Sequence, residues 1–240
     1  MIEIHPVEGL PEIGEADDLG ALIAERTHLQ DGDVLVVAQK AVSKAEGRVV
    51  RLADVEPSEE ARRLAAGEDP RRLEVILRKS KRIVRTRPPL VIAETRHGFV
   101  CASAGVDSSN APGAETVVLL PEDPDASAAG LRARLRELTG VDVGVIVSDS
   151  FGRPWRLGTT DVAIGVAGVR PLLDLAGERD PAGYELHATV IAVADELAAA
   201  AELVLGKTSR TPAAIVRGAN AGGQGTARDL VMPAERDLFR

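Results

Sequence analysis

The feature that most constrains the fold is the stretch 81–103, where three strand-like segments follow one another with very little chain between them. The segments cover 81–86, 90–94 and 99–103, and RPP at 87–89 and RHG at 96–98 connect them. Connections this short join antiparallel strands, because a parallel crossover needs about a dozen residues or more. The stretch therefore predicts an antiparallel sheet and argues against a doubly wound parallel sheet.

Further strand and helix patterns surround this stretch. Short β-branched runs predict strands over 33–38, 143–148, 162–167, 188–193 and 213–217. Apolar periodicity and capping residues predict helices over 17–29, 59–66, 71–79, about 126–139 and 195–205. The expected fold class is α+β with mixed, largely antiparallel sheets. No repeat or long linker divides the chain, so 1–240 is expected to form a single unit.

Composition excludes several classes of protein. The net charge is -8, and only one Trp, one Tyr and three Phe are present, which argues against a nucleic-acid binder. No apolar run is long enough to span a membrane, and the first residues lack the layout of a signal peptide, so we expect a cytoplasmic protein. The lone Cys101 excludes an internal disulfide and a multi-cysteine metal site.

One phosphate-binding motif is present only in part. Gly206-Lys207-Thr208 matches the end of a P-loop, but Ala201 occupies the position that needs the first glycine, and a helical pattern precedes the motif where a strand is required. A true P-loop is therefore not expected. The polar loop after Gly206 can still contact phosphate through Lys207 and its hydroxyl neighbours.

Acidic and hydroxyl side chains follow two of the predicted strands. Asp107 comes after the strand 99–103, and Asp149 and Ser150 stand at the tip of the strand 143–148. Their oxygens are the ligands that Mg²⁺ and Mn²⁺ prefer. If the fold brings Asp107 and Asp149 together, they and Ser150 would hold one or two divalent ions that bridge nucleotide phosphates. The alternative for Asp107 is an Asx turn or a helix cap.

Basic residues lie near the same strand ends. Lys40 and Lys44 follow the strand 33–38, where they would neutralise triphosphate charge, or else form part of a solvated helical turn. Arg153 and Arg156 would bind anionic substrate groups, or else are surface residues after a turn. The segment EGLPEI at 8–13 forms a rigid turn that would line a nucleotide pocket.

Four segments, taken in order, resemble the coenzyme F420-0:L-glutamate ligase family, whose members are also called gamma-glutamyl ligases. They are GLPEI at 9–13, VVAQKAVSKAEGR at 36–48, HGFVCASAGVDSSN at 97–110 and VSDSFGRPWRLGTTDVAIGVAG at 147–168. The likeness extends from about residue 4 to residue 217. The last two segments are long enough to make a chance match a poor explanation.

The resemblance implies a GTP-dependent ligase that adds L-glutamate to the deazaflavin precursor coenzyme F420-0 through an acyl phosphate, releasing GDP and phosphate. Further gamma-linked glutamates would follow. It also implies Mg²⁺ or Mn²⁺ as one or two ions, assistance from K⁺, and a two-lobed fold peculiar to the family. Family members form an intertwined homodimer with the site in a groove at the interface.

The resemblance also implies roles for individual residues. Asp107, Asp149 and Ser150 look like metal ligands, and Asp107, Asp149 and Lys44 are the expected catalytic residues. The expected nucleotide contacts are Leu10, Pro11, Glu12, Ile13, Gln39, Lys44, Asn110, Gly206, Lys207, Thr208 and Ser209. Arg153 and Arg156 remain the candidates for binding the substrate.

The sequence departs from the family pattern at a few positions. Ser150 stands where Thr is common and keeps the hydroxyl, whereas Gln39 stands where a small hydroxyl residue is expected. Lys207 lies where some relatives offer a ligand to a second metal, and a protonated lysine cannot ligate. Two other functions use the same residues: a metal-dependent phosphohydrolase or phosphotransferase, and a nucleotide-sensing module without catalysis.

Overall fold

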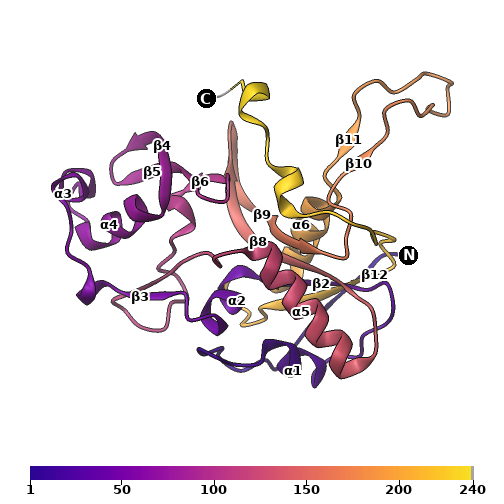
Figure 1. The fold of residues 1–240 in the computed structure, drawn as a ribbon, viewed down its shortest axis with the longest axis horizontal. Coiled ribbons are helices and arrows are strands. Elements are labelled where there is room, and N and C mark those ends of the chain that lie inside the picture. The colour runs from indigo at the N-terminus through magenta and orange to yellow at the C-terminus, as the bar shows by residue number, and fades with distance from the viewer. Residues whose placement is uncertain (239–240) are drawn as a thin grey trace.

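The central element is a five-stranded sheet (Figure 1). The computed structural model describes residues 1–238. The sheet order is β1 (Glu3–Pro6), β12 (Ala213–Arg217), β2 (Val34–Ala38), β8 (Gly144–Arg153) and β9 (Arg156–Ala167). Only β2 and β8 are parallel neighbours, and the other three pairs are antiparallel. The mixed, largely antiparallel arrangement confirms the α+β prediction.

Helices cover both faces of this sheet, because its middle strands are apolar on both sides. On one face, α1 (Leu19–Ala24) and α5 (Pro124–Thr139) enclose a core that includes Val145 and Val147. On the other face, α6 (Val193–Leu205) packs over a second core that includes Ile146. Alternation along a strand sends successive side chains to opposite faces, so β8 contributes to both cores.

A second group of elements has its own core. The strands β4 (Ser80–Arg87), β5 (Leu90–Thr95) and β6 (Val100–Ala102) form the antiparallel sheet predicted from the short connections. The helices α3 (Glu59–Ala65) and α4 (Pro70–Lys79) pack beside it, and β3 (Val49–Arg51) pairs with β7 (Thr116–Val118). Short 3₁₀ turns at Leu52–Asp54 (η1) and Ser103–Gly105 (η2) complete this group, whose apolar side chains form a third core.

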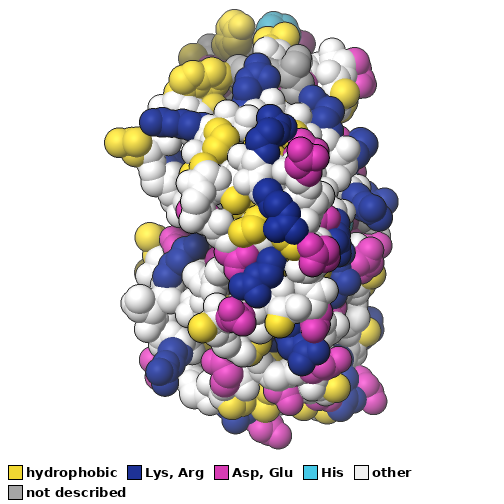
Figure 2. Space-filling model, turned by 90° about the vertical axis from the view of Figure 1, so that its left-hand side faces the viewer, with side chains coloured by type: hydrophobic (Ala, Val, Ile, Leu, Met, Phe, Trp, Pro, Cys, Tyr) yellow, Lys and Arg dark blue, Asp and Glu magenta, His cyan; other side chains and the backbone are white. Residues whose placement is uncertain are grey.

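The surface of this second group is densely charged. Figure 2 shows Lys and Arg side chains down the middle of the face that carries it, with Asp and Glu side chains between them. Many of these charges are paired: Arg51 with Asp54 and Arg62 with Glu56, for example, each at 2.8 Å. Exposed pairs of this kind stabilise little individually, so the folding of this group depends mainly on its apolar core.

Several predicted boundaries were wrong. The predicted strand 143–148 continues as β8 to Arg153, because β9 pairs with it through a hairpin around Pro154 and Trp155. The predicted helix over 17–29 ends at Ala24, and the buried Leu29 reaches the core from a loop. The strand predicted over 188–193 shrinks to β11 (Val190–Ile191), which pairs only with β10 (Leu173–Asp174) in an arm that projects from the body (Figure 1).

Several elements were not predicted as such, among them the short strands β1, β3, β7 and β10. The segment after β2 forms the helix α2 (Gln39–Ala45), and 3₁₀ turns at Ala227–Leu230 (η3) and Ala234–Arg236 (η4) lie near the C-terminus. In the described part of the chain, no helix is long and apolar enough to cross a membrane.

Candidate active site

A cleft opens where β2 ends. Ala38, the last residue of β2, pairs with Ser148, and the chain then turns into α2. Beyond Ser148, β8 continues to Arg153 without β2 beside it. The cleft at this point has a volume of about 610 Å³. Its lining comes from five parts of the chain: 10–13, 38–44, Asn110, the β8–β9 residues Ser148, Asp149, Ser150 and Asp161, and the segment 202–212 that contains Glu202, Lys207, Thr208 and Arg210.

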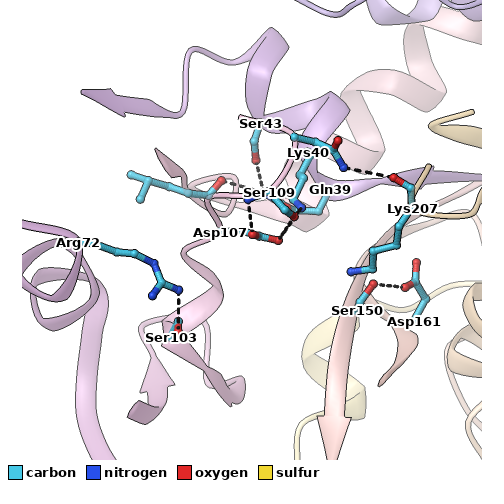
Figure 3. Close-up of polar contacts among 12 residues, drawn as sticks. Gln39, Lys40, Ser43, Arg72, Ser103, Asp107, Ser109, Ser150, Asp161 and Lys207 are labelled. Atoms are coloured by element: carbon cyan, nitrogen blue, oxygen red, sulfur yellow. Dashed lines mark hydrogen bonds and ion pairs between the residues drawn. The ribbon is translucent and has the colours of Figure 1, made fainter. Parts of the chain in front are cut away.

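Asp107 and Lys40 meet at one edge of this cleft. The Lys40 Nζ lies 2.5 Å from the Asp107 Oδ2 and donates to the Ser109 Oγ at 2.6 Å. The Ser109 amide also donates to the Asp107 Oδ1 at 2.7 Å. Burial raises the pKa of Asp107, but the hydrogen bonds from Lys40 and Ser109 outweigh it and hold that pKa below its usual value. Asp107 is therefore an anion at neutral pH. Figure 3 shows this cluster between α2 and the loop after η2.

Asp149 interacts electrostatically with the same cluster. Burial raises the pKa of Asp149 to about 7, and the charges of Asp161 and Asp107 add to the rise, whereas the Ser150 amide and Lys40 oppose it. Lys40, which pairs with Asp107, lines the cleft together with Asp149, so two aspartates that lie 42 residues apart in sequence both border this cleft.

Asp161 belongs to the site, although the sequence analysis gave it no role. Its Oδ1 accepts from the Ser150 hydroxyl at 2.6 Å, and its Oδ2 accepts from the Ser148 hydroxyl at 2.8 Å. The register of the β8–β9 hairpin places Asp161 directly opposite Ser150. The only sequence signal for this residue is an acidic side chain at the start of an apolar strand, and the hairpin register was needed to interpret it.

The helix α2 supplies Lys44 and Gln39 in different environments. Lys44 is almost fully buried along its stem, and its Nζ lies 2.5 Å from the exposed Glu12 carboxylate in the segment 10–13. Gln39 is 2% exposed, and its amide donates to the Ser43 hydroxyl at 2.7 Å and the Leu119 carbonyl at 2.8 Å. The amide of Gln39 therefore joins α2 to the chain after β7, and Gln39 and Lys44 both line the cleft.

The loop after α6 closes another side of the cleft. The Asn110 amide donates to the Lys207 carbonyl across 3.5 Å, so two segments expected to contact a nucleotide lie next to each other. Figure 3 shows the Lys207 side chain directed toward the pair Ser150 and Asp161. The Ser209 hydroxyl donates to the carbonyls of Leu205 and Gly206, which caps the end of α6.

The two predicted substrate arginines lie away from this cleft within one chain. Arg153 and Arg156 flank the exposed turn at Pro154 and Trp155, and neither lines the cleft. The Arg153 guanidinium donates to the Leu157 carbonyl at 3.3 Å. The pairing of β8 with β9 extends the hairpin and carries both arginines beyond the end of β2.

The site offers oxygen donors and ammonium groups in close proximity. Within residues 1–238, no group of three or more His, Cys, Asp or Glu side chains is arranged to hold a metal ion. The oxygens of Asp107, Asp149 and Ser150 are nevertheless hard donors of the type that Mg²⁺ and Mn²⁺ select. A cation beside Asp149 would also favour its ionised form, against the burial and the charges of Asp161 and Asp107 that raise its pKa. The donor set thus fits a hard divalent ion.

An α+β protein whose polar cleft gathers anionic oxygens and lysines beside a strand end belongs to the class of enzymes that position charged substrates. The sequence model of the F420-0:Gamma-glutamyl ligase family matches residues 9–218, and this chain belongs to that family. It is therefore a ligase of coenzyme F420 biosynthesis.

Full-length relatives support the assignment. The chain is 50% identical to the coenzyme F420:L-glutamate ligase of Methanopyrus kandleri, a match that covers 100% of this chain and 98% of the relative. It is 45% identical to the enzyme of the same name from Methanothermobacter thermautotrophicus, with 100% and 99% covered. The identity to the Haloarcula marismortui enzyme of that name is 44%, with 100% and 96% covered.

Proposed function

We propose that this chain is a GTP-dependent ligase that joins L-glutamate to coenzyme F420-0 through an acyl phosphate and releases GDP and phosphate. Further gamma-linked glutamates are added by the same chemistry. The observation that carries the proposal is the Asp107–Lys40 ion pair at the edge of a cleft that Asp149, Lys44 and Lys207 line. Acids that hold divalent ions and lysines that face phosphates are the two groups that nucleotide-driven carboxylate activation needs.

Divalent ions are proposed as part of this site. Asp107, Asp149 and Ser150 would hold Mg²⁺ or Mn²⁺ as one or two ions, and K⁺ is proposed as an assisting ion. When bound, the divalent ions neutralise charge on the nucleotide phosphates. The Ser148 and Ser150 hydroxyls both donate to Asp161, which fixes their orientation toward the cleft.

The residues of the chain then act by position and charge. Lys44, whose stem is buried by α2, presents a fixed ammonium group to the terminal phosphate of GTP. The segments 10–13 and 206–209, together with Asn110, would hold the rest of the nucleotide. The acceptor carboxylate attacks the γ-phosphorus, GDP leaves, and the glutamate amine then displaces phosphate from the acyl phosphate. No nucleophile of the protein is required.

The working unit is proposed to be a cytoplasmic homodimer of intertwined lobes. The hairpin end carries two large exposed apolar side chains, Trp155 at 83% and Leu157 at 100% exposure. Exposed apolar groups of this size at the tip of a projecting element suit contact with another surface. A second copy would also bring Arg153 and Arg156 near a cleft other than their own, where they would bind the anionic substrate.

The decisive experiment combines the purified chain with coenzyme F420-0, L-glutamate, a divalent salt and either GTP or ATP. We expect a product whose mass has risen by one or more glutamyl units, with phosphate released only when both acceptor and glutamate are present. Phosphate release without glutamate would instead indicate a phosphohydrolase, and binding of GTP without turnover would indicate a sensing module. Equal product with ATP would contradict the guanine preference.

A further inference from the structure

A second cleft, separate from the one described above, lies between the second group of elements and the C-terminal segment. Its volume is about 350 Å³. Arg48 enters it from the turn after α2, Lys79 from the end of α4, Arg96 and His97 from the turn between β5 and β6, and Arg228 from η3. Glu122 is the one carboxylate in the lining among residues 1–238. We call this feature the basic cleft.

The charges of the basic cleft are incompletely paired. Arg48 binds Glu122 at 2.7 Å, and Arg228 lies 3.8 Å from Asp123. Lys79 and Arg96 have no acidic partner within 4.0 Å among residues 1–238. In a chain of net charge -8, a cavity with four permanently basic side chains and one carboxylate is a local excess of positive charge. Such an excess inside a concavity attracts anions.

The walls of the basic cleft are held rigidly. The His97 Nε2 lies 3.1 Å from the carbonyl oxygens of both Pro121 and Glu122, and since both are acceptors, Nε2 carries the proton. The Arg48 Nε donates to the Leu120 carbonyl at 3.2 Å. The backbone of 119–122 is thus fixed from two sides, and the His97 ring also stacks on Phe99 with centroids 5.6 Å apart. A cavity with fixed walls is preorganised for a ligand.

Its size and its place in the fold restrict the ligand. Water fills about 30 Å³ per molecule, so a cavity of about 350 Å³ is far larger than one phosphate ion needs. The lining residues Ala104 and Val106 lie three and one positions before Asp107, so the basic cleft and the edge of the candidate active site share one short segment of chain. A ligand with several carboxylates spread over the length of a dipeptide satisfies both the charge and the volume.

We infer that the basic cleft binds a polycarboxylate of dipeptide size, with Lys79 and Arg96 as its principal charged contacts. This inference rests on the proposed function for the identity of the ligand, because a gamma-linked glutamate chain is such a polycarboxylate. None of the residues that line the basic cleft is among those that the family resemblance assigns to nucleotide or metal binding. Bound there, the tail of an already extended substrate would be retained between additions.

The test measures binding directly by calorimetry, with γ-L-glutamyl-L-glutamate as the probe. Nucleotide and divalent salts are omitted, so the result does not depend on ligation. We expect saturable binding at low ionic strength, and the double substitution Lys79→Gln with Arg96→Gln should weaken it at least tenfold. The matched control, Arg85→Gln with Arg87→Gln on the exposed strand β4, removes the same charge from the same group of elements and should change the affinity less than twofold.

Each other result has a definite meaning. Because Lys79 and Arg96 have no acidic partner among the described residues, the double variant should keep its melting temperature, which separates lost binding from lost folding. Absence of binding, or equal weakening by the control pair, overturns the inference. Inorganic phosphate binding as tightly as the dipeptide overturns the polycarboxylate as ligand. If the chain binds the dipeptide but does not catalyse ligation, the proposed function is disproved, whereas the inferred binding site in the basic cleft is supported.

Discussion

At the scale of single residues, the candidate active site depends on side chains whose charges oppose one another. Burial raises the pKa of Asp149, and the negative charges of Asp161 and Asp107 add to the rise, whereas the Ser150 amide and Lys40 oppose it. A buried carboxyl in that position is unfavourable for folding, so its presence indicates a role in binding or catalysis. Lys40 links two of these groups through Asp107 and Ser109, and the same ammonium is placed to face an anionic ligand in the cleft.

Replacing Asp149 tests the proposed metal ligand. We expect Asp149→Asn to lower the ligation rate about a hundredfold or more, because the amide loses the charge that would attract a divalent cation. In EDTA the variant should melt within a few degrees of the parent, since the substitution removes a repelled charge and keeps the shape. Quantitative mass spectrometry of the product measures the rate, and near-normal turnover would exclude Asp149 from the metal site.

Replacing Asp161 tests a residue that orients the hydroxyls of Ser148 and Ser150 rather than one proposed to bind the cation. Asp161→Asn should cut activity by about 10- to 100-fold and raise the Mg²⁺ concentration that gives half-maximal rate, because an amide cannot accept from both Ser148 and Ser150. A purely structural role would lower stability without moving the Mg²⁺ requirement. Titrating the rate with Mg²⁺ at saturating GTP distinguishes the two.

At the scale of elements, the second group shows how a helix pair is fixed by one carboxylate. Glu74 on α4 accepts from the backbone of Ser58, the cap of α3, at 2.9 Å and from Arg78 at 2.8 Å. The Ser58 hydroxyl and amide, followed by Arg78, lower the pKa of Glu74 to about 2. Because its carboxylate accepts hydrogen bonds from both Ser58 and Arg78, Glu74 connects the start of α3 to the middle of α4.

The lowered pKa predicts a pH dependence of stability. Because the folded pKa lies below the unfolded value of 4.5, the contribution of Glu74 is fully present above that value and is lost as the pH falls toward about 2. We expect Glu74→Gln to reduce the free energy of unfolding by about 1–3 kcal/mol at pH 7 and by progressively less as the pH falls to 3. Urea unfolding measures this difference. Glu59→Gln, at an exposed site on α3, should change it by less than about 0.5 kcal/mol.

The elements also show what local sequence determines. The strands of the stretch 81–103 and the helix 126–139 were predicted nearly in full, because short connections and capping residues such as Asp123 and Gly140 are local signals. The end of β8 was missed because the polar run from Ser148 to Ser150 looks like a strand end, and only pairing with β9 continues it. Asp161 was missed for the same reason. The approach of Asp107 to Asp149 stays a condition of the proposed metal site, since long-range contacts have no local signal in the sequence.

At the scale of the whole molecule, one sheet with a core on each face supports a second group of elements with a core of its own. The candidate active site lies beside the central sheet, and the basic cleft lies where the second group meets the C-terminal segment. The hairpin of β8 and β9 and the arm of β10 and β11 project from this body (Figure 1). Projecting elements with exposed apolar tips are the natural points of contact for a partner of the same chain.

The proposed homodimer can be tested at the hairpin tip. Leu157→Glu should convert the dimer into a monomer and reduce ligation, because a charge would replace a fully exposed apolar side chain in the contact. Leu203→Glu is the matched control, since Leu203 is 81% exposed on α6 and should leave the assembly unchanged. Light scattering after size exclusion gives the mass of each variant. A monomeric parent, or a Leu157→Glu variant that stays dimeric, would contradict the prediction.

The strand β2 ends at Ala38 while its neighbour β8 continues to Arg153, and this difference affects which substitutions in β8 the enzyme can tolerate. From Asp149 to Arg153, the edge of β8 that faces away from β9 pairs with no other strand in the described chain, and of these residues Asp149 and Ser150 line the cleft, where their main chain lies close to any ligand. A ligand that binds to backbone amides and carbonyls does not depend on which side chains those residues carry. Main-chain contacts there would survive a change of side chain, although the carboxylate of Asp149 and the hydroxyl of Ser150 keep their own proposed roles, whereas a residue that lacks an amide hydrogen would remove a donor.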